Sequence, residues 1–140
     1  MPHEPATPDL VSLGRQAYQA IGRGDVDAVM SFFAADAVYD LTDAGLETFE
    51  GEQAIRRFIE DWHRSWEDYR YEVQELRDLG HGVVLSVLRE GGRLVGGGGR
   101  VEQHVAHLTR WANGKIGWLK HYTDPDEARV AAARLAGELG

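Results

Sequence analysis

The chain has 140 residues, of which 43% are apolar, and this length and composition predict one domain with a hydrophobic core. Its 23 acidic residues outnumber 15 Lys and Arg that form no basic cluster, and the net charge of −8 argues against a nucleic-acid or anionic-membrane partner. The chain has no cysteine, which excludes disulfides, thiolate catalysis and cysteine-based metal sites.

The N-terminal segment MPHEPATPDL contains Pro2, Pro5 and Pro8 and lacks the apolar run of a signal peptide or a membrane span. We therefore predict a flexible tail over residues 1–8 and a single domain over residues 9–140. The same segment leads us to expect a cytoplasmic protein without a membrane partner.

The first half of the chain predicts three helices that precede most of the strands. Asp9 can cap the first helix, in which apolar residues from Leu10 to Ile21 recur at helical spacing. The expected elements are a helix that ends at Gly22 to Gly24, a short helix over residues 25–35, a strand over residues 37–41, an exposed acidic loop over residues 42–50 and an amphipathic helix over residues 52–66.

The second half predicts a set of strands and a final helix. The strands are expected over residues 69–78, 83–90, 98–111 and 115–122, and the helix begins at Pro125 with Asp124 as its N-cap. The run Gly96–Gly99 lies between two strands, so we interpret it as a turn rather than a phosphate-binding loop, which would join a strand to a helix. This order predicts an α+β cone: three N-terminal helices packed on a curved, mixed and mostly antiparallel sheet, with a short C-terminal helix.

A family pattern runs through residues 24–28 (GDVDA), 33–39 (FAADAVY), 51–58 (GEQAIRRF), 114–116 (GKI) and 122–124 (YTD). Together these segments resemble the nuclear transport factor 2-like superfamily, in its SnoaL-like, ketosteroid isomerase-like branch. The resemblance covers nearly the whole chain. It implies a cone-shaped fold with a ligand pocket between sheet and helices, and usually a homodimer formed through the outer face of the sheet. Similar scaffolds host ketosteroid isomerase, limonene epoxide hydrolase, polyketide cyclases, dehydratases and noncatalytic binding proteins.

The residues that ketosteroid isomerases use are mostly replaced in this chain. Leu41 stands where those enzymes have the general base Asp, and Ala106 stands where a second acid precedes a histidine, here His107. Tyr18 is about one residue out of register with their oxyanion-binding Tyr. Steroid isomerisation by that set of residues is therefore not expected.

The limonene epoxide hydrolase pattern is also incomplete. Tyr39 matches a Tyr that holds the attacking water, and His121 falls where the catalytic Asp lies. Leu41 replaces the Asn that shares the water. Arg89 and Glu90 are adjacent on a strand and must point to opposite faces, so they do not reproduce the required Arg-x-Asp pair.

Strand alternation suggests a different pair of catalytic histidines. If His121 faces the cavity, then Leu119 faces it too. On the preceding strand, the family alignment places Ala106 inward, and alternation then places His104 and Leu108 inward and His107 outward. Two imidazoles in one cavity could act as a neutral base and a cationic acid.

We therefore predict His121 as the base, His104 as an acid or orienting group, and Tyr39 as a hydrogen-bond donor. Each histidine can instead be a surface or core residue, and that alternative stays open for both. His104 and His107 are three residues apart on a strand and therefore point to opposite sides, so their spacing does not favour a metal site. We also expect no cofactor.

Aromatic residues of the third helix are expected to line the pocket, because that helix covers the cavity. The expected ligand-binding residues are Tyr18, Leu41, Phe58, Trp62, Trp66, Leu108 and Leu119. The acidic loop with Asp43, Glu47 and Glu50 is either solvated or a lid. A face with Val105, Thr109, Trp111, Trp118 and Tyr122 could form the dimer surface.

The sequence thus predicts a small-molecule enzyme that performs cofactor-free acid–base chemistry of the isomerase, cyclase or hydrolase type on a small cyclic or aromatic substrate. The alternatives are a noncatalytic ligand-binding protein of the same fold and a dimerisation module. An enzyme should have at least two polar groups converging in the cavity, and a dimerisation module should fill the cavity with its own side chains.

Overall fold

The computed structural model describes residues 9–139. Its elements in chain order are α1 (Leu10–Arg23), α2 (Val26–Met30), β1 (Phe33–Asp40), the short 3-10 helix η1 (Thr42–Ala44), β2 (Thr48–Glu50), α3 (Glu52–Arg64), β3 (Trp66–Asp78), β4 (Val83–Leu94), β5 (Arg100–Ala112), β6 (Lys115–Tyr122) and α4 (Pro125–Leu139). The predicted tail over residues 1–8 and the terminal Gly140 lie outside the described residues.

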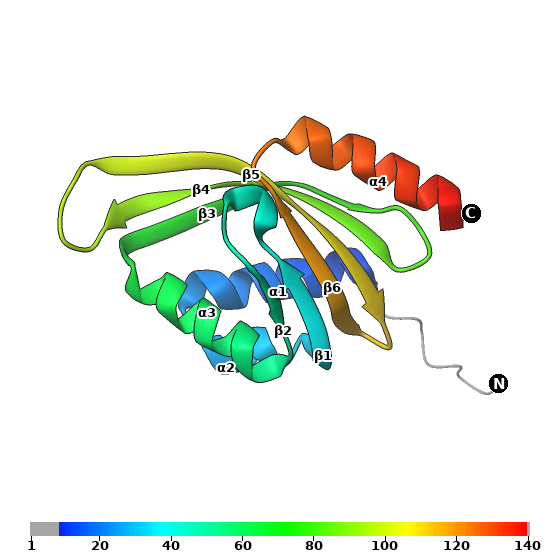
Figure 1. The fold of residues 1–140 in the computed structure, drawn as a ribbon, viewed down its shortest axis with the longest axis horizontal. Coiled ribbons are helices and arrows are strands. Elements are labelled where there is room, and N and C mark those ends of the chain that lie inside the picture. Colours follow the sequence, from blue (N-terminus) through cyan, green and yellow to red (C-terminus); the bar gives the residue numbers. More distant parts are fainter. Residues whose placement is uncertain (1–8, 140) are drawn as a thin grey trace.

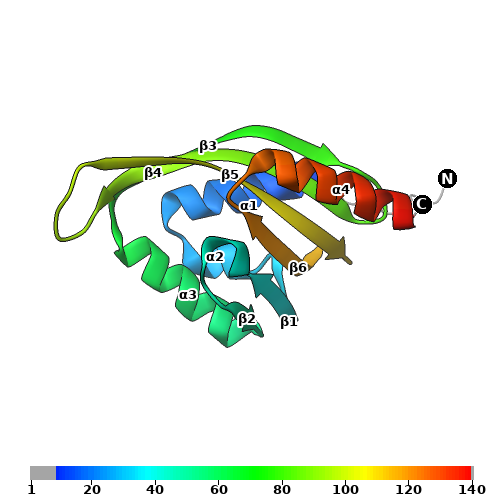
Figure 2. The ribbon, with the colours of Figure 1, turned by 45° about the horizontal axis from the view of Figure 1, so that its top comes forward.

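The strands form a curved sheet in the order β2-β1-β6-β5-β4-β3 (Figure 1). β1 runs parallel to β6, and the other neighbouring strands are antiparallel. Helices α1, α2 and α3 cover the inner, concave face of the sheet, and α4 lies across the outer face (Figure 2). The predicted α+β cone with its C-terminal helix is therefore confirmed.

The start and end of α1 follow from local chemistry. The Asp9 carboxylate accepts hydrogen bonds from two backbone amides of the first turn, and Gly24 ends the helix in the left-handed conformation, with a φ of 69°. Small residues, including Ala17 and Ala20, are buried on the face toward the sheet. These small residues let α1 lie close to the sheet, and the helix thereby places the Tyr18 side chain in the interior.

The sheet separates two hydrophobic layers, because β4 is buried on both faces. Along β4, alternate side chains such as Val83 and Leu85 pack beneath Ala128 and Ala132 of α4. The side chains between them point into the cone, where α1, α2 and α3 close the other layer. Both layers of the core thus depend on the alternation of β4 and β5.

Several boundaries differ from the sequence-based expectation. The acidic segment 42–50 contains η1 and the strand β2, which pairs with β1 through Tyr39 and Phe49. β1 begins at Phe33, and β3 begins at Trp66, which pairs with Leu94. The extensions of β1 and β3 depend on Ile116 and Leu94, which are far away in the chain, so the local pattern did not indicate them. The Gly96–Gly99 run joins β4 to β5, as predicted.

The expected dimer surface does not lie on one face. Val105, Thr109 and Trp111 point to the inner side of the sheet, where Thr109 and Trp111 line a cavity. Trp118 and Tyr122 lie on the outer side and pack partly against the layer beneath α4. The expectation was wrong for β5, because the alternation of that strand was assigned to the wrong faces.

Candidate functional site

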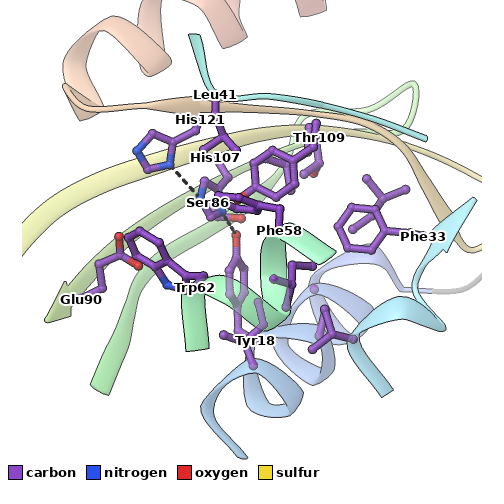
Figure 3. Close-up of a pocket in the computed structure, with 18 of the residues that line it drawn as sticks. Tyr18, Phe33, Leu41, Phe58, Trp62, Ser86, Glu90, His107, Thr109 and His121 are labelled. Atoms are coloured by element: carbon purple, nitrogen blue, oxygen red, sulfur yellow. Dashed lines mark hydrogen bonds between the residues drawn. The ribbon is translucent and has the colours of Figure 1, made fainter. Parts of the chain in front are cut away.

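A cavity of about 330 Å³ lies between the inner face of the sheet and the helices (Figure 3). Its wall is mostly apolar and aromatic, with contributions from Phe33, Leu41, Phe58, Trp62, Trp111 and Leu119. No Lys or Arg from the described part of the chain lines it. The volume and the character of the wall suit a small, mostly apolar ligand.

Three side chains from different elements form a continuous hydrogen-bonded chain inside this cavity (Figure 3). The Tyr18 hydroxyl lies 2.8 Å from His107 Nδ1, and His107 Nε2 lies 3.3 Å from His121 Nδ1. All three side chains are buried. Helix α1 supplies the tyrosine, and the antiparallel pairing of β5 with β6 places His107 directly opposite His121.

Burial determines the protonation of this chain. It lowers the pKa of His107 to about 3, with a further contribution from His121. Burial also lowers the pKa of His121, while the nearby Asp43 acts in the opposite direction. The pKa of Tyr18 is raised, again chiefly by burial. At neutral pH all three groups are therefore uncharged.

An uncharged chain of this kind has two proton arrangements. In one, His121 Nδ1–H donates to His107 Nε2, His107 Nδ1–H donates to the Tyr18 oxygen, and His121 Nε2 carries a free electron pair. In the other, the Tyr18 hydroxyl donates to His107 Nδ1, and His107 Nε2–H donates to His121. The first arrangement makes His121 Nε2 a base within an apolar cavity.

The acidic segment after β1 contributes to the surroundings of His121. The Asp43 carboxylate accepts hydrogen bonds from the Thr123 backbone amide at 2.8 Å and from its hydroxyl at 3.0 Å. Leu41, Ala44 and Leu46 from the same segment line the cavity. The segment therefore forms part of the wall and brings a carboxylate near His121.

A second polar pair lies elsewhere in the cavity wall. The Tyr69 hydroxyl of β3 donates a hydrogen bond to Glu90 Oε2 of β4 at 2.5 Å. Burial raises the pKa of Glu90, and the hydrogen bond from Tyr69 offsets part of this rise. Burial and the proximity of Glu90 raise the pKa of Tyr69 and of Tyr39. Polar groups from at least two parts of the wall thus face one apolar cavity.

The Tyr39 side chain is also largely buried in the cavity wall. Among residues 9–139 it has no hydrogen-bond partner, although its ring packs edge-on against Phe58 and His107. Since its raised pKa keeps the hydroxyl protonated, the group can donate a hydrogen bond to a ligand.

The structure places most of the predicted site residues together. Those that line the cavity are Tyr18, Tyr39, Leu41, Phe58, Trp62, Leu119 and His121. Trp66 is buried behind this wall and packs against Trp62 and Tyr69. Leu108 lies on the opposite face of β5, in the layer beneath α4, so its expected place in the pocket was wrong.

The expectation that His104 faces the cavity was also wrong. His104 is exposed, and His107 occupies the inward position. Residues Val105 to Thr109 are all buried, so the hydrophobic pattern of β5 carries no sign of which face is which. The register with β4, which pairs His107 with Ser86, determines the face.

Sequence reasoning missed Glu90, Tyr69 and His63, which all line the cavity. It placed Arg89 and Glu90 on opposite faces, and the structure confirms this, with Arg89 exposed and Glu90 buried. A signal was present, because Glu90 continues the alternation of an otherwise apolar run.

No three His, Asp or Glu side chains in residues 9–139 come together as a metal site, and no helix there has the length and apolar character needed to cross a bilayer.

Comparisons with known proteins agree with this architecture. The SnoaL-like domain family matches residues 15–117. A hypothetical protein from Catenulispora acidiphila with a ketosteroid isomerase-like fold, solved in complex with trimethylamine, is 20% identical, with a TM-score of 0.71 over 84% of this chain and 86% of that chain. No curated protein matches the sequence significantly.

Two further solved structures share the fold. A nuclear transport factor 2-like protein of unknown function from Burkholderia pseudomallei is 20% identical, with a TM-score of 0.73 over 86% of this chain and 95% of that chain. An uncharacterised cystatin-fold protein from Novosphingobium aromaticivorans is 17% identical, with a TM-score of 0.72 over 82% of this chain and 98% of that chain. Together with the family match, these likenesses show that the chain belongs to the SnoaL-like domain family and has the nuclear transport factor 2-like fold.

Proposed function

We propose that this protein is an enzyme that moves a proton on a carbon beside a carbonyl group of a small, mostly apolar cyclic substrate, with His121 as the general base. The observation that carries the proposal is the Tyr18–His107–His121 chain inside the apolar cavity. Because His121 lines the cavity, a substrate bound there could contact its imidazole ring. No metal ion or cofactor takes part in the proposed step.

The proposed step begins with the substrate carbonyl near the Tyr39 hydroxyl, which has no hydrogen-bond partner among residues 9–139. His121 Nε2 takes the proton from the neighbouring carbon, and the electron pair of the broken C–H bond forms an enolate. The Tyr39 hydroxyl donates a hydrogen bond to the enolate oxygen. His121 then returns the proton to the same carbon, or to another carbon in an isomerisation.

The surroundings of His121 support this step. In the proton arrangement that the proposal uses, His107 Nε2 accepts the Nδ1–H of His121, and His121 Nε2 is left free for the substrate. When His121 becomes charged, the Asp43 carboxylate beside it favours the imidazolium. His107 is a positioning residue in this scheme, because it acts through His121.

A noncatalytic ligand-binding protein is the second candidate. The specific observation in its favour is that His107 already has hydrogen-bond partners at both ring nitrogens within the protein. Such a chain can be a satisfied element of the core, with the cavity serving only to hold an apolar molecule.

Proton exchange separates the two candidates without knowledge of the natural reaction. We would incubate the protein with a panel of flat cyclic ketones in deuterium oxide and follow deuterium uptake at the carbons beside the carbonyl by NMR. Thermal shift measurements on the same panel report binding independently. The proposed enzyme should accelerate uptake into at least one ketone that it binds.

The matched variants are His121→Ala and His104→Ala. We expect His121→Ala to reduce the exchange rate by at least about 100-fold, the usual range for loss of a general base, and to keep ketone binding. His104→Ala, which changes an exposed histidine, should exchange at the native rate. Ketone binding without exchange in the native protein, or equal exchange in His121→Ala, would overturn the catalytic proposal.

A further inference from the structure

The Glu90 carboxyl is a buried acid for which residues 9–139 provide no counter-ion. Its side chain is only 7% exposed, and within residues 9–139 it has one hydrogen-bond donor, the Tyr69 hydroxyl, and no ion pair. A carboxylate can accept about four hydrogen bonds, so most of its acceptor capacity is unused. Burying such a group is costly unless it is paired. The described residues therefore leave the Glu90 carboxyl without a charged partner and with free hydrogen-bond acceptor capacity.

Aromatic rings lie near this acid. Trp62 and Tyr69 line the cavity, their ring centroids lie 6.3 Å apart and their planes meet at 83°. Trp66 packs behind both rings, at 5.5 Å from Trp62 and 5.7 Å from Tyr69. Figure 3 shows Trp62 on the same side of the pocket as Glu90. Trp62, Tyr69 and Glu90 together form what we call the polar corner of the cavity.

The charges around the cavity favour a positive ligand at this corner. Burial lowers the pKa of His63, His107 and His121, so the histidines of the wall are neutral at neutral pH. No Lys or Arg of the described residues lines the wall. An anionic ligand would meet no cationic side chain of residues 9–139 in the wall and would face Glu90. A cation would favour the ionised form of Glu90 and could also lie against the electron-rich faces of Trp62 and Tyr69.

We propose that the polar corner formed by Trp62, Tyr69 and Glu90 binds an organic ammonium group, so that the ligand of this cavity is a cyclic or aromatic amine in its protonated form. The inference deepens the proposed function and rests on it for one point only, the placement of the reacting carbon near His121. The binding of the cation itself depends on the corner alone.

A pair of probes with equal shape tests the charge directly. The cation is (4-hydroxyphenyl)trimethylammonium, and the neutral compound is 4-tert-butylphenol, in which a carbon replaces the charged nitrogen. Isothermal titration calorimetry at neutral pH gives the affinity of each probe for the native protein. We expect the cation to bind at least about tenfold more tightly, which corresponds to a desolvated cation–π contact with an added carboxylate.

Glu90→Gln is the informative variant, because it keeps the size of the side chain and its capacity to accept from Tyr69. It should weaken cation binding by about tenfold or more and change binding of the neutral probe by less than about threefold. The control Glu127→Gln removes the same charge from an exposed position on α4 and should leave both affinities unchanged. Trp62→Leu should also lower the preference for the cation.

Three outcomes would overturn the inference. They are equal affinities for the two probes in the native protein, a cation preference that survives in Glu90→Gln, and an equal loss of cation affinity in Glu127→Gln. The second result would mean that Glu90 remains a neutral acid. Ketone exchange that depends on His121 can persist in any of these cases, so failure of the ammonium site and failure of the proposed function are distinguishable.

Discussion

His107 is held neutral at the centre of the cavity wall, and this state makes the stability of the protein depend on pH. A histidine in the unfolded chain has a pKa of about 6.5, whereas burial lowers the pKa of His107 to about 3. Between these values the unfolded state binds a proton that the native state does not. The free energy of unfolding therefore falls as the pH drops through this window and is highest above it.

Replacing His107 by Asn should remove this contribution. Native protein should lose stability more steeply than His107→Asn between neutral pH and pH 5, by up to about 1.4 kcal/mol per pH unit. The raised pKa of Glu90 acts in the opposite direction, but it is present in both proteins. Urea unfolding at a series of pH values measures the difference. The exposed His104→Asn serves as the control, and parallel curves for native protein and His107→Asn would contradict the assignment.

At the scale of elements, β5 is the strand on which the site depends, because both of its faces are buried. Its inner side chains contribute His107, Thr109 and Trp111 to the cavity, and its outer side chains contribute Ala106 and Leu108 to the layer beneath α4. β5 thus contributes side chains both to the cavity and to the hydrophobic layer beneath α4, which lies outside the cavity.

This division predicts that stability and binding can be changed separately. Leu108→Ala should lower the free energy of unfolding by about 2–5 kcal/mol, the usual range for a buried leucine. It should change probe affinity by less than about threefold, since Leu108 lies behind the sheet. Leu119→Ala on β6 opens the cavity wall and should alter probe affinity clearly. Denaturant unfolding and calorimetry on both variants check this, and a large affinity loss in Leu108→Ala would contradict the assignment of faces.

At the scale of the whole molecule, α4 determines which part of the outer face of the sheet is covered. It covers the middle of the sheet but leaves Trp118 and Tyr122 of β6 half-buried. We keep the homodimer as a prediction and place these two rings in its interface, because half-exposed aromatic residues are common at protein–protein contacts.

Light scattering coupled to size-exclusion chromatography tests the dimer. The chain has a mass of 15.6 kDa, so the native protein should elute with about twice that mass. Trp118→Glu should shift it to the monomer with its secondary structure intact by circular dichroism. A native protein that stays monomeric at high micromolar concentration would show that the prediction is wrong.

The sequence by itself predicted the order of the helices and of five of the six strands and the cap of α1, because these follow from local periodicity and side-chain chemistry within a few residues. The fold family followed from the resemblance of five segments to the nuclear transport factor 2-like superfamily. The sequence also predicted His121, Tyr39 and Tyr18 in one region, and the structure places all three on the cavity wall. Only the tertiary structure decided that His107 faces inward in place of His104, and that Tyr69 of β3 meets Glu90 of β4. The physical reason is that a strand buried on both faces has no amphipathic signal, so its orientation depends on its register with neighbouring strands and on the helix that covers its outer side.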